Sequence, residues 1–92
     1  MDGRYRSVHA TKTTLVADLK DLADEYKKGS ATDAEVRELL AQWKANTPGL
    51  FLAVKHEGGN DVGFEPVLSD RIKRLIGSRR ALIVQAWLDN LD

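Results

Sequence analysis

The segment from residue 49 to residue 67, GLFLAVKHEGGNDVGFEPV, decides the fold class of this chain of 92 residues. Its apolar run from Leu50 to Val54 suits a buried strand as well as a helix end, because periodicity does not separate the two over so short a stretch. In one interpretation the run is a strand, the glycines make a turn, and Val62 and Phe64 lie on the returning strand of a hairpin. In the other, a short helical extension precedes an irregular loop. We favour the loop, because a two-stranded hairpin is marginal without a packed face.

Before this segment, residues 11–49 are predicted to form a pair of helices. Apolar side chains in the first helix recur at spacings of four, three and four, the pattern of an amphipathic helix: Leu15, Leu19, Leu22 and Tyr26. Gly29 is suited to end this helix, because glycine readily adopts the left-handed conformation at that position.

The second helix of the pair has a capping box at its start. Thr32 is the predicted N-cap and Glu35 lies three residues later, and the sequence Asn46-Thr47-Pro48-Gly49 ends the helix. Because only a few residues join the two helices, we expect an antiparallel pair. Residues 1–10 are predicted to be an N-terminal arm, with Tyr5 and Val8 as its sizeable anchors.

After the ambiguous segment, residues 67–92 are predicted to form a second helical pair that resembles a helix-turn-helix. Pro66 suits the first position of the third helix, Gly77 ends it, and Ser78 caps a fourth helix from about Arg79 to Leu91. The inward side chains of the third helix are predicted to be Leu68, Ile72, Leu75 and Ile76. The expected fold is therefore a single all-α domain over residues 1–92, with four helices in a compact arrangement and an insertion over residues 50–66.

A helix-turn-helix raises the question of DNA binding, since the second helix of that motif enters the major groove. Here the second helix begins with Arg79 and Arg80, but most of its later residues are apolar: Leu82, Ile83, Val84, Ala86, Trp87, Leu88 and Leu91. A helix that is apolar nearly all round is usually buried. We therefore predict a core helix, with Trp87 buried at its centre, and not a recognition helix.

Basic side chains are concentrated ahead of this helix. Five lie within ten residues, with Asp70 as the only neighbouring acid: Arg71, Lys73, Arg74, Arg79 and Arg80. Our preferred interpretation is a solvated face balanced by the acids of the first helix. A site for phosphate or for an acidic partner is the functional alternative.

Composition and motifs exclude several classes of function. The chain has 14 basic and 14 acidic side chains and no cysteine, which argues against general polyanion binding and against thiolate chemistry. We find no phosphate-binding loop, no metal-ligand spacing around His9 or His56, and no nucleophile motif. No catalytic residue, cofactor, metal or small-molecule substrate is therefore expected. With no secretion signal or membrane span recognisable, we expect a cytoplasmic protein.

Several short stretches together resemble a family of short bacterial proteins, about 90 residues long, that have no assigned function. The resembling stretches are YRS, EYKKG, TDAEVRELLAQW, NTPGLF and IGSRRALIVQAWL. The resemblance implies a small helical cytosolic protein and supplies no catalytic residues.

The sequence thus predicts a small non-catalytic module that binds another protein or a second copy of itself. Its candidate partner-binding residues are Arg71, Lys73, Arg74, Arg79, Arg80, Leu50 and Phe51. The alternative is a nucleic-acid-binding regulator that uses the basic segment 71–80.

Overall fold

The computed structural model describes residues 5, 6 and 8–91, so parts of the predicted arm (residues 1–4 and 7) and residue 92 lie outside the described residues. The elements follow the order α1 (Lys12–Lys28), α2 (Asp33–Asn46), a 3-10 turn η1 (Pro48–Leu50), β1 (Leu52–Glu57), β2 (Asn60–Leu68), α3 (Asp70–Ile76) and α4 (Ser78–Asp89). Strands β1 and β2 form an antiparallel hairpin between the second and third helices. The fold is therefore α+β, and the predicted all-α class is wrong.

The hairpin forms because its root is packed, which the sequence prediction did not anticipate. Leu52 and Leu68 are directly opposed in the register and are only 3% and 1% exposed. The turn falls at Gly58 and Gly59, whose φ angles of 59° and 83° are the positive values that a two-residue type I′ turn requires. Residues 50–66, for which we favoured a loop, thus form most of a β-hairpin anchored in the core.

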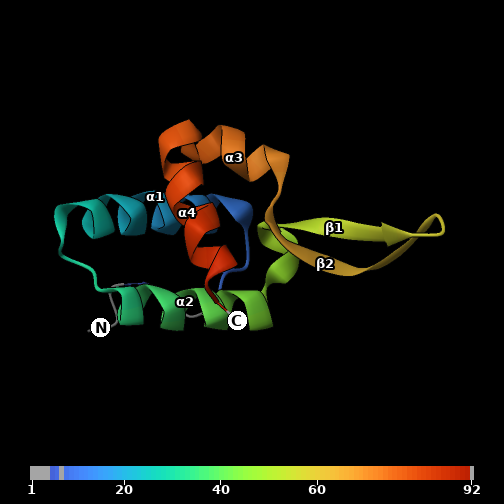
Figure 1. The fold of residues 1–92 in the computed structure, drawn as a ribbon, viewed down its shortest axis with the longest axis horizontal. Coiled ribbons are helices and arrows are strands. Elements are labelled where there is room, and N and C mark those ends of the chain that lie inside the picture. Colours follow the sequence, from blue (N-terminus) through green and yellow to red (C-terminus); the bar gives the residue numbers. More distant parts are fainter. Residues whose placement is uncertain (1–4, 7, 92) are drawn as a thin grey trace.

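The outer part of the hairpin extends away from the helices into solvent (Figure 1). This projection gives the molecule extents of 43 × 26 × 24 Å. Two register shifts interrupt the ladder, one between Leu52 and Val54 and one between Lys55 and His56. From Val54 to Pro66 all the hairpin residues are exposed.

The end of α1 and the start of α2 are as predicted. The Thr11 side chain caps α1, and Gly29 ends it in the left-handed conformation with φ of 86°. At α2 the Thr32 hydroxyl oxygen accepts a hydrogen bond from the Glu35 amide at 3.3 Å, and the same hydroxyl donates to the Glu35 carboxylate at 3.0 Å. The predicted N-cap of α2 is confirmed.

The boundaries of the last two helices differ from the prediction. Pro66 belongs to β2 and does not start a helix, because the pairing of Leu68 with Leu52 continues the strand past it. Helix α3 begins at Asp70, where the Ser69 side chain accepts a hydrogen bond from the Ile72 amide. Helix α4 begins one residue earlier than predicted, at Ser78 with Gly77 as its cap, and ends at Asp89.

Helix α4 packs against both α1 and α2, and in Figure 1 it runs across α1 toward α2. Helices α1 and α2 run antiparallel, as predicted. The core centres on Trp43 of α2, which is fully buried, and on Trp87 of α4, which is 6% exposed. The predicted burial of Trp87 is confirmed.

Candidate functional site

The structure separates the seven predicted partner-binding residues into a surface group and an interior group. Arg71, Arg74 and Arg79 are exposed, and Lys73 is half-buried beside them. Leu50 is partly buried and packs against the core, whereas Phe51 is fully buried. Phe51 precedes the hairpin root, where its carbonyl oxygen accepts a hydrogen bond from the Ser69 amide at 2.8 Å. Phe51 is therefore a core residue, and its assignment to a binding surface is wrong.

Arg80 is tied to α1. Its Nε donates to one carboxylate oxygen of Asp24 at 3.1 Å, and its terminal nitrogen donates to the other at 3.0 Å. This two-point contact lowers the pKa of Asp24, chiefly through the hydrogen bond from Arg80, and raises the pKa of Arg80. The predicted balance between the basic segment and the acids of the first helix is confirmed for Arg80.

The other four basic residues of the segment make no two-point contact, of the kind that Arg80 makes, with a carboxylate of the described residues. Among residues 5, 6 and 8–91, Lys73 approaches Asp70 only at 4.0 Å, and no ion pair is formed by Arg71, Arg74 or Arg79. Three guanidinium groups therefore stay available to an external anion at the α3–α4 end of the molecule.

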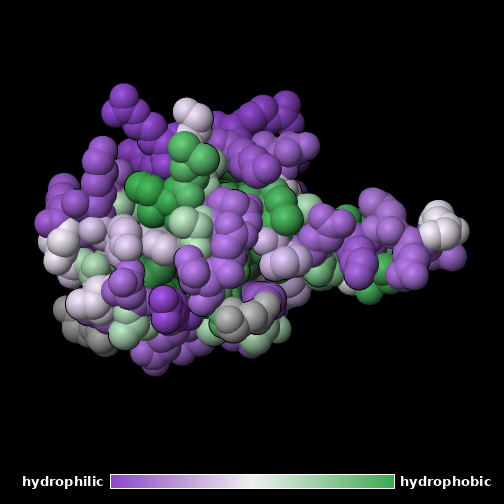
Figure 2. Space-filling view, in the orientation of Figure 1, coloured by the Kyte–Doolittle hydropathy of each residue, from purple (hydrophilic) through white to green (hydrophobic). Residues whose placement is uncertain are grey.

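An apolar groove lies beside these cations. It has a volume of ≈ 560 Å³ and lies between α3 and α4, with a lining that includes Gly77, Ala81 and Leu82 as well as Lys73 and Arg74. Figure 2 shows hydrophobic side chains gathered over this part of the molecule, with hydrophilic ones around them. The arrangement is an apolar floor with a positively charged rim.

Leu82 is the central apolar side chain of this surface and is 75% exposed, the most exposed large hydrophobic of the described residues. The prediction that α4 is apolar all round, and hence buried, missed this. The buried face of α4 is made by Ala81, Val84, Trp87 and Leu88. Leu82 lies three residues after the exposed Arg79, so the helical spacing places it on the outer face and could have revealed it.

Leu75 was predicted to point inward and is 46% exposed, because α3 buries its Ile72 and Ile76 face instead. Leu75 comes directly after Arg74 and lies four residues after Arg71, both of which are exposed. The outer face of α3 thus repeats the combination of apolar and basic side chains found at the groove.

A second hollow, of ≈ 460 Å³, lies on another side of Leu82. Its lining combines Trp87 and Ile83 with the polar side chains of Tyr26, Asp33 and Arg37. The neighbouring Asp33 carboxylate raises the pKa of Tyr26. Both signs of charge occur at this hollow, so it has no net preference for an anionic or a cationic ligand.

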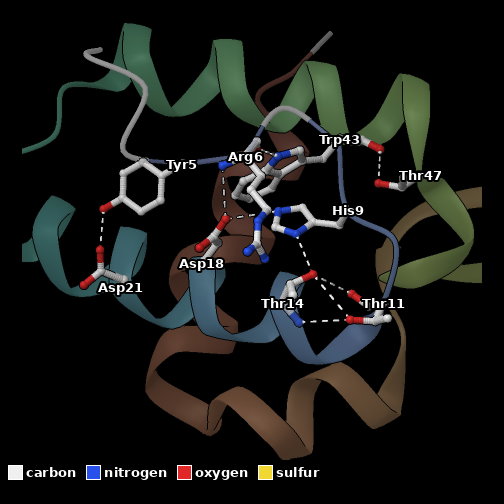
Figure 3. A network of polar contacts seen from close by, with 9 residues as sticks. All are labelled: Tyr5, Arg6, His9, Thr11, Thr14, Asp18, Asp21, Trp43 and Thr47. Carbon is white, nitrogen blue, oxygen red and sulfur yellow. Dashed lines mark hydrogen bonds and ion pairs between the residues drawn. The ribbon is translucent and has the colours of Figure 1, made fainter.

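The most extensive polar network of the described residues joins the N-terminal segment to α1 and α2 (Figure 3). The Tyr5 hydroxyl donates to the Asp21 carboxylate at 2.7 Å, and the Arg6 amide donates to Asp18 at 3.3 Å. The indole N–H of Trp43 donates to the Arg6 carbonyl oxygen at 2.6 Å. These contacts hold the N-terminal segment in place across two helices.

His9, which is 2% exposed, lies inside this network. The Thr14 hydroxyl oxygen lies 3.0 Å from His9 Nδ1 and 3.1 Å from the Thr11 carbonyl oxygen. The other ring nitrogen lies 3.2 Å from the Asp18 carboxylate. Burial lowers the pKa of His9, with Asp18 acting in the opposite direction and Arg6 adding to the decrease. Because the ring is enclosed, this network serves to position the N-terminal segment.

Within the described ranges, no three His, Cys, Asp or Glu side chains are grouped so that they could hold a metal ion. Neither is any helix there long and apolar enough to span a bilayer. Compared with known proteins, the chain matches no family model, no curated protein and no solved structure.

Proposed function

We propose that this chain is a non-catalytic protein-binding module whose α3–α4 surface receives an acidic and partly apolar segment of a partner. The single observation behind the proposal is the position of Leu82, which is 75% exposed and lines a groove that the cations Lys73 and Arg74 also line. An apolar anchor surrounded by charges is a common arrangement for binding a protein segment, because desolvation of the anchor supplies affinity and the charges supply specificity.

The same cations also suit nucleic acid, which is the competing function. A duplex-reading helix needs polar side chains along its exposed face. The outer face of α4 instead has Leu82 and Ala86 exposed after Arg79. Burying Leu82 against a phosphate backbone would place an apolar side chain next to charge without compensation. The mixed surface therefore supports a protein ligand over a nucleic acid.

The test is a titration monitored by fluorescence anisotropy, with three probes. The first probe is a labelled helical peptide with Leu on one face and Glu on the other. The second is the same peptide with Lys in place of Glu, and the third is a DNA duplex. We expect binding of the acidic peptide only, and a loss of affinity of about tenfold or more in Leu82→Gln and in Arg74→Gln/Arg79→Gln.

Val8→Gln is the matched control, since Val8 is also an exposed hydrophobic, at 55%, but lies on the N-terminal segment. It should bind the acidic peptide like the unmodified protein. Tighter binding to the duplex than to the acidic peptide at physiological salt would overturn the proposal in favour of nucleic acid. Equal binding to both peptides would show that the cationic rim has no role.

A further inference from the structure

The hairpin presents apolar side chains to solvent outside the helical core. Val54, Val62 and Phe64 are 41%, 50% and 42% exposed. Val54 and Phe64 are directly opposed in the register, so their side chains share a face of the ribbon. Phe64 also lies close to η1, since a Cβ added at Gly49 would be 3.4 Å from its ring. The hairpin therefore offers an apolar face that begins at its root and is uncovered in the single chain.

The same hairpin has an acidic character. It contains Glu57, Asp61 and Glu65 against one lysine, Lys55, so its net charge is −2 with His56 neutral. This combination of apolar and acidic side chains is the chemistry that the groove between α3 and α4 would bind. The two surfaces are complementary in charge and both contain unburied apolar groups.

The hairpin is held so that it does not reach the groove of its own chain. Gln85 of α4, which lines the groove, donates to the Pro66 carbonyl oxygen at 3.1 Å and accepts from the Leu68 amide at 3.0 Å. These bonds fix the hairpin root beside the groove, and the ribbon then runs outward, away from α3 and α4 (Figure 1). The root of the acidic and apolar hairpin thus lies next to the groove between α3 and α4, whose chemistry matches it. The rest of the hairpin points away from that groove.

We infer that the occupant of the groove is the hairpin of a second copy of this chain, exchanged reciprocally across a two-fold axis. In such a dimer each protomer contributes one hairpin and one groove, which gives a closed and self-complementary interface. The zero formal net charge of the chain means that long-range repulsion does not oppose association. This inference rests on the proposed function, because it names the partner of the same groove.

Docking by side chains fits the hairpin better than addition of strands to its edges. The two register shifts distort the ladder, and β2 contains Pro66, which donates no backbone hydrogen bond. Bulges, proline and charged side chains are features that discourage pairing between sheet edges. The interface is therefore expected to depend on Val62, Phe64 and the acidic side chains.

Charge exchange between two variants tests this pairing. Glu57→Lys/Glu65→Lys reverses the hairpin charge. Arg74→Glu/Arg79→Glu reverses one cation that lines the groove, Arg74, and one that directly follows the lining residue Ser78, Arg79. Each variant alone would place like charges together at both contacts. In a mixture of the two, each hairpin would again meet a groove of opposite charge.

Sedimentation velocity over a wide concentration range provides the measurement. We expect the unmodified protein to dimerise, each reversed variant to dimerise about tenfold more weakly or worse, and the mixture to form a heterodimer of near-normal affinity. Val62→Thr, which keeps strand propensity while removing an exposed apolar side chain, should also weaken the dimer. Circular dichroism establishes that each variant keeps its fold.

Lys12→Glu/Lys27→Glu, on exposed positions of α1, is the control for reversal of two positive charges and should dimerise normally. A monomer at all concentrations overturns the inference, as does a dimer that neither reversal weakens or a mixture that does not restore association. The proposed function is tested separately, by titrating the acidic peptide into Glu57→Lys/Glu65→Lys. Peptide binding there with a monomeric unmodified protein would leave the groove assignment standing and remove only the second copy as its occupant.

Discussion

The two tryptophans occupy opposite kinds of environment, although both lie on the apolar stripe of a helix. Trp43 is fully buried, its N–H has an acceptor on Arg6, and its ring meets His9 edge to face at 5.1 Å. Trp87 contacts the Tyr26 ring in a similar way at 5.3 Å, but its buried N–H makes no well-formed hydrogen bond among the described residues and acts only on the Tyr26 hydroxyl, whose pKa it lowers slightly against the larger effect of Asp33. The Trp43 side of the molecule is closed by the N-terminal segment, whereas the Trp87 side borders a hollow. The two rings thus differ in enclosure and in hydrogen bonding, although both belong to the core.

The largest difference between the two sides is expected on truncation of the rings. Trp43→Ala and Trp87→Ala should each lower the free energy of unfolding by about 3–5 kcal/mol, with Trp43→Ala at the upper end, because its cavity is fully enclosed and a hydrogen bond is also lost. Urea denaturation followed by circular dichroism measures both. A smaller loss in the free energy of unfolding for Trp43→Ala than for Trp87→Ala would contradict the tighter enclosure of Trp43.

Replacement by phenylalanine isolates the polar part of the difference. Trp43→Phe removes the donor to the Arg6 carbonyl oxygen and should cost about 1 kcal/mol more than Trp87→Phe, which removes a donor that makes no well-formed hydrogen bond among the described residues. Paired unfolding curves of the two variants give this difference directly. Equal costs would mean that the Arg6 contact contributes nothing in solution.

Near neutral pH, acidification should act on the Trp43 side through His9. Burial lowers the pKa of His9 below 6.5 in the folded chain, so the unfolded chain binds the proton more readily. The stability due to neutral His9 is present above pH 6.5 and is lost as the pH falls through the lower folded pKa. His9→Gln should therefore reduce stability near neutral pH and flatten its decrease between roughly pH 7 and roughly pH 5.

Unfolding curves at several pH values within that window measure this dependence. Retention of the full decrease in His9→Gln would assign it to other groups. Tyr5→Phe is a suitable companion variant, because it removes the Tyr5 hydroxyl from the same network while His9 keeps its own contacts. It should lower stability without flattening the dependence on pH.

The smallest effects are expected among the arginines of the α3–α4 surface. Arg80→Met should lower the melting temperature slightly, since it leaves Asp24 without its two-point partner, whereas Arg74→Met should leave it unchanged. Thermal melts at low and high salt measure both. The Arg80 effect should shrink with added salt, and a larger effect from Arg74 would mean that this side chain has a structural role.

Much of the helical part could be predicted because its signals are local. The Thr32 cap and the Gly29 stop each depend on a few neighbouring residues, and so does the apolar spacing of α1. The hairpin could not be predicted in the same way, because its stability depends on the burial of Leu52 opposite Leu68, residues 16 apart in the sequence. The helical spacing of Leu82 from Arg79 in α4 was sufficient to predict that Leu82 is exposed. The high apolar content of the helix led to the opposite prediction.

Local chemistry alone therefore determined where α1 ends, where α2 begins and ends, that Trp87 is buried, and that the basic residues cluster between Arg71 and Arg80. Tertiary structure decided which of those arginines is paired, since only the packing of α4 on α1 brings Arg80 to Asp24. It also decided that the apolar segment after η1 becomes a projecting ribbon beside a groove. Capping and periodicity act within a few residues along the chain, whereas pairing of charges and burial of a hairpin root depend on residues that only the folded chain brings together.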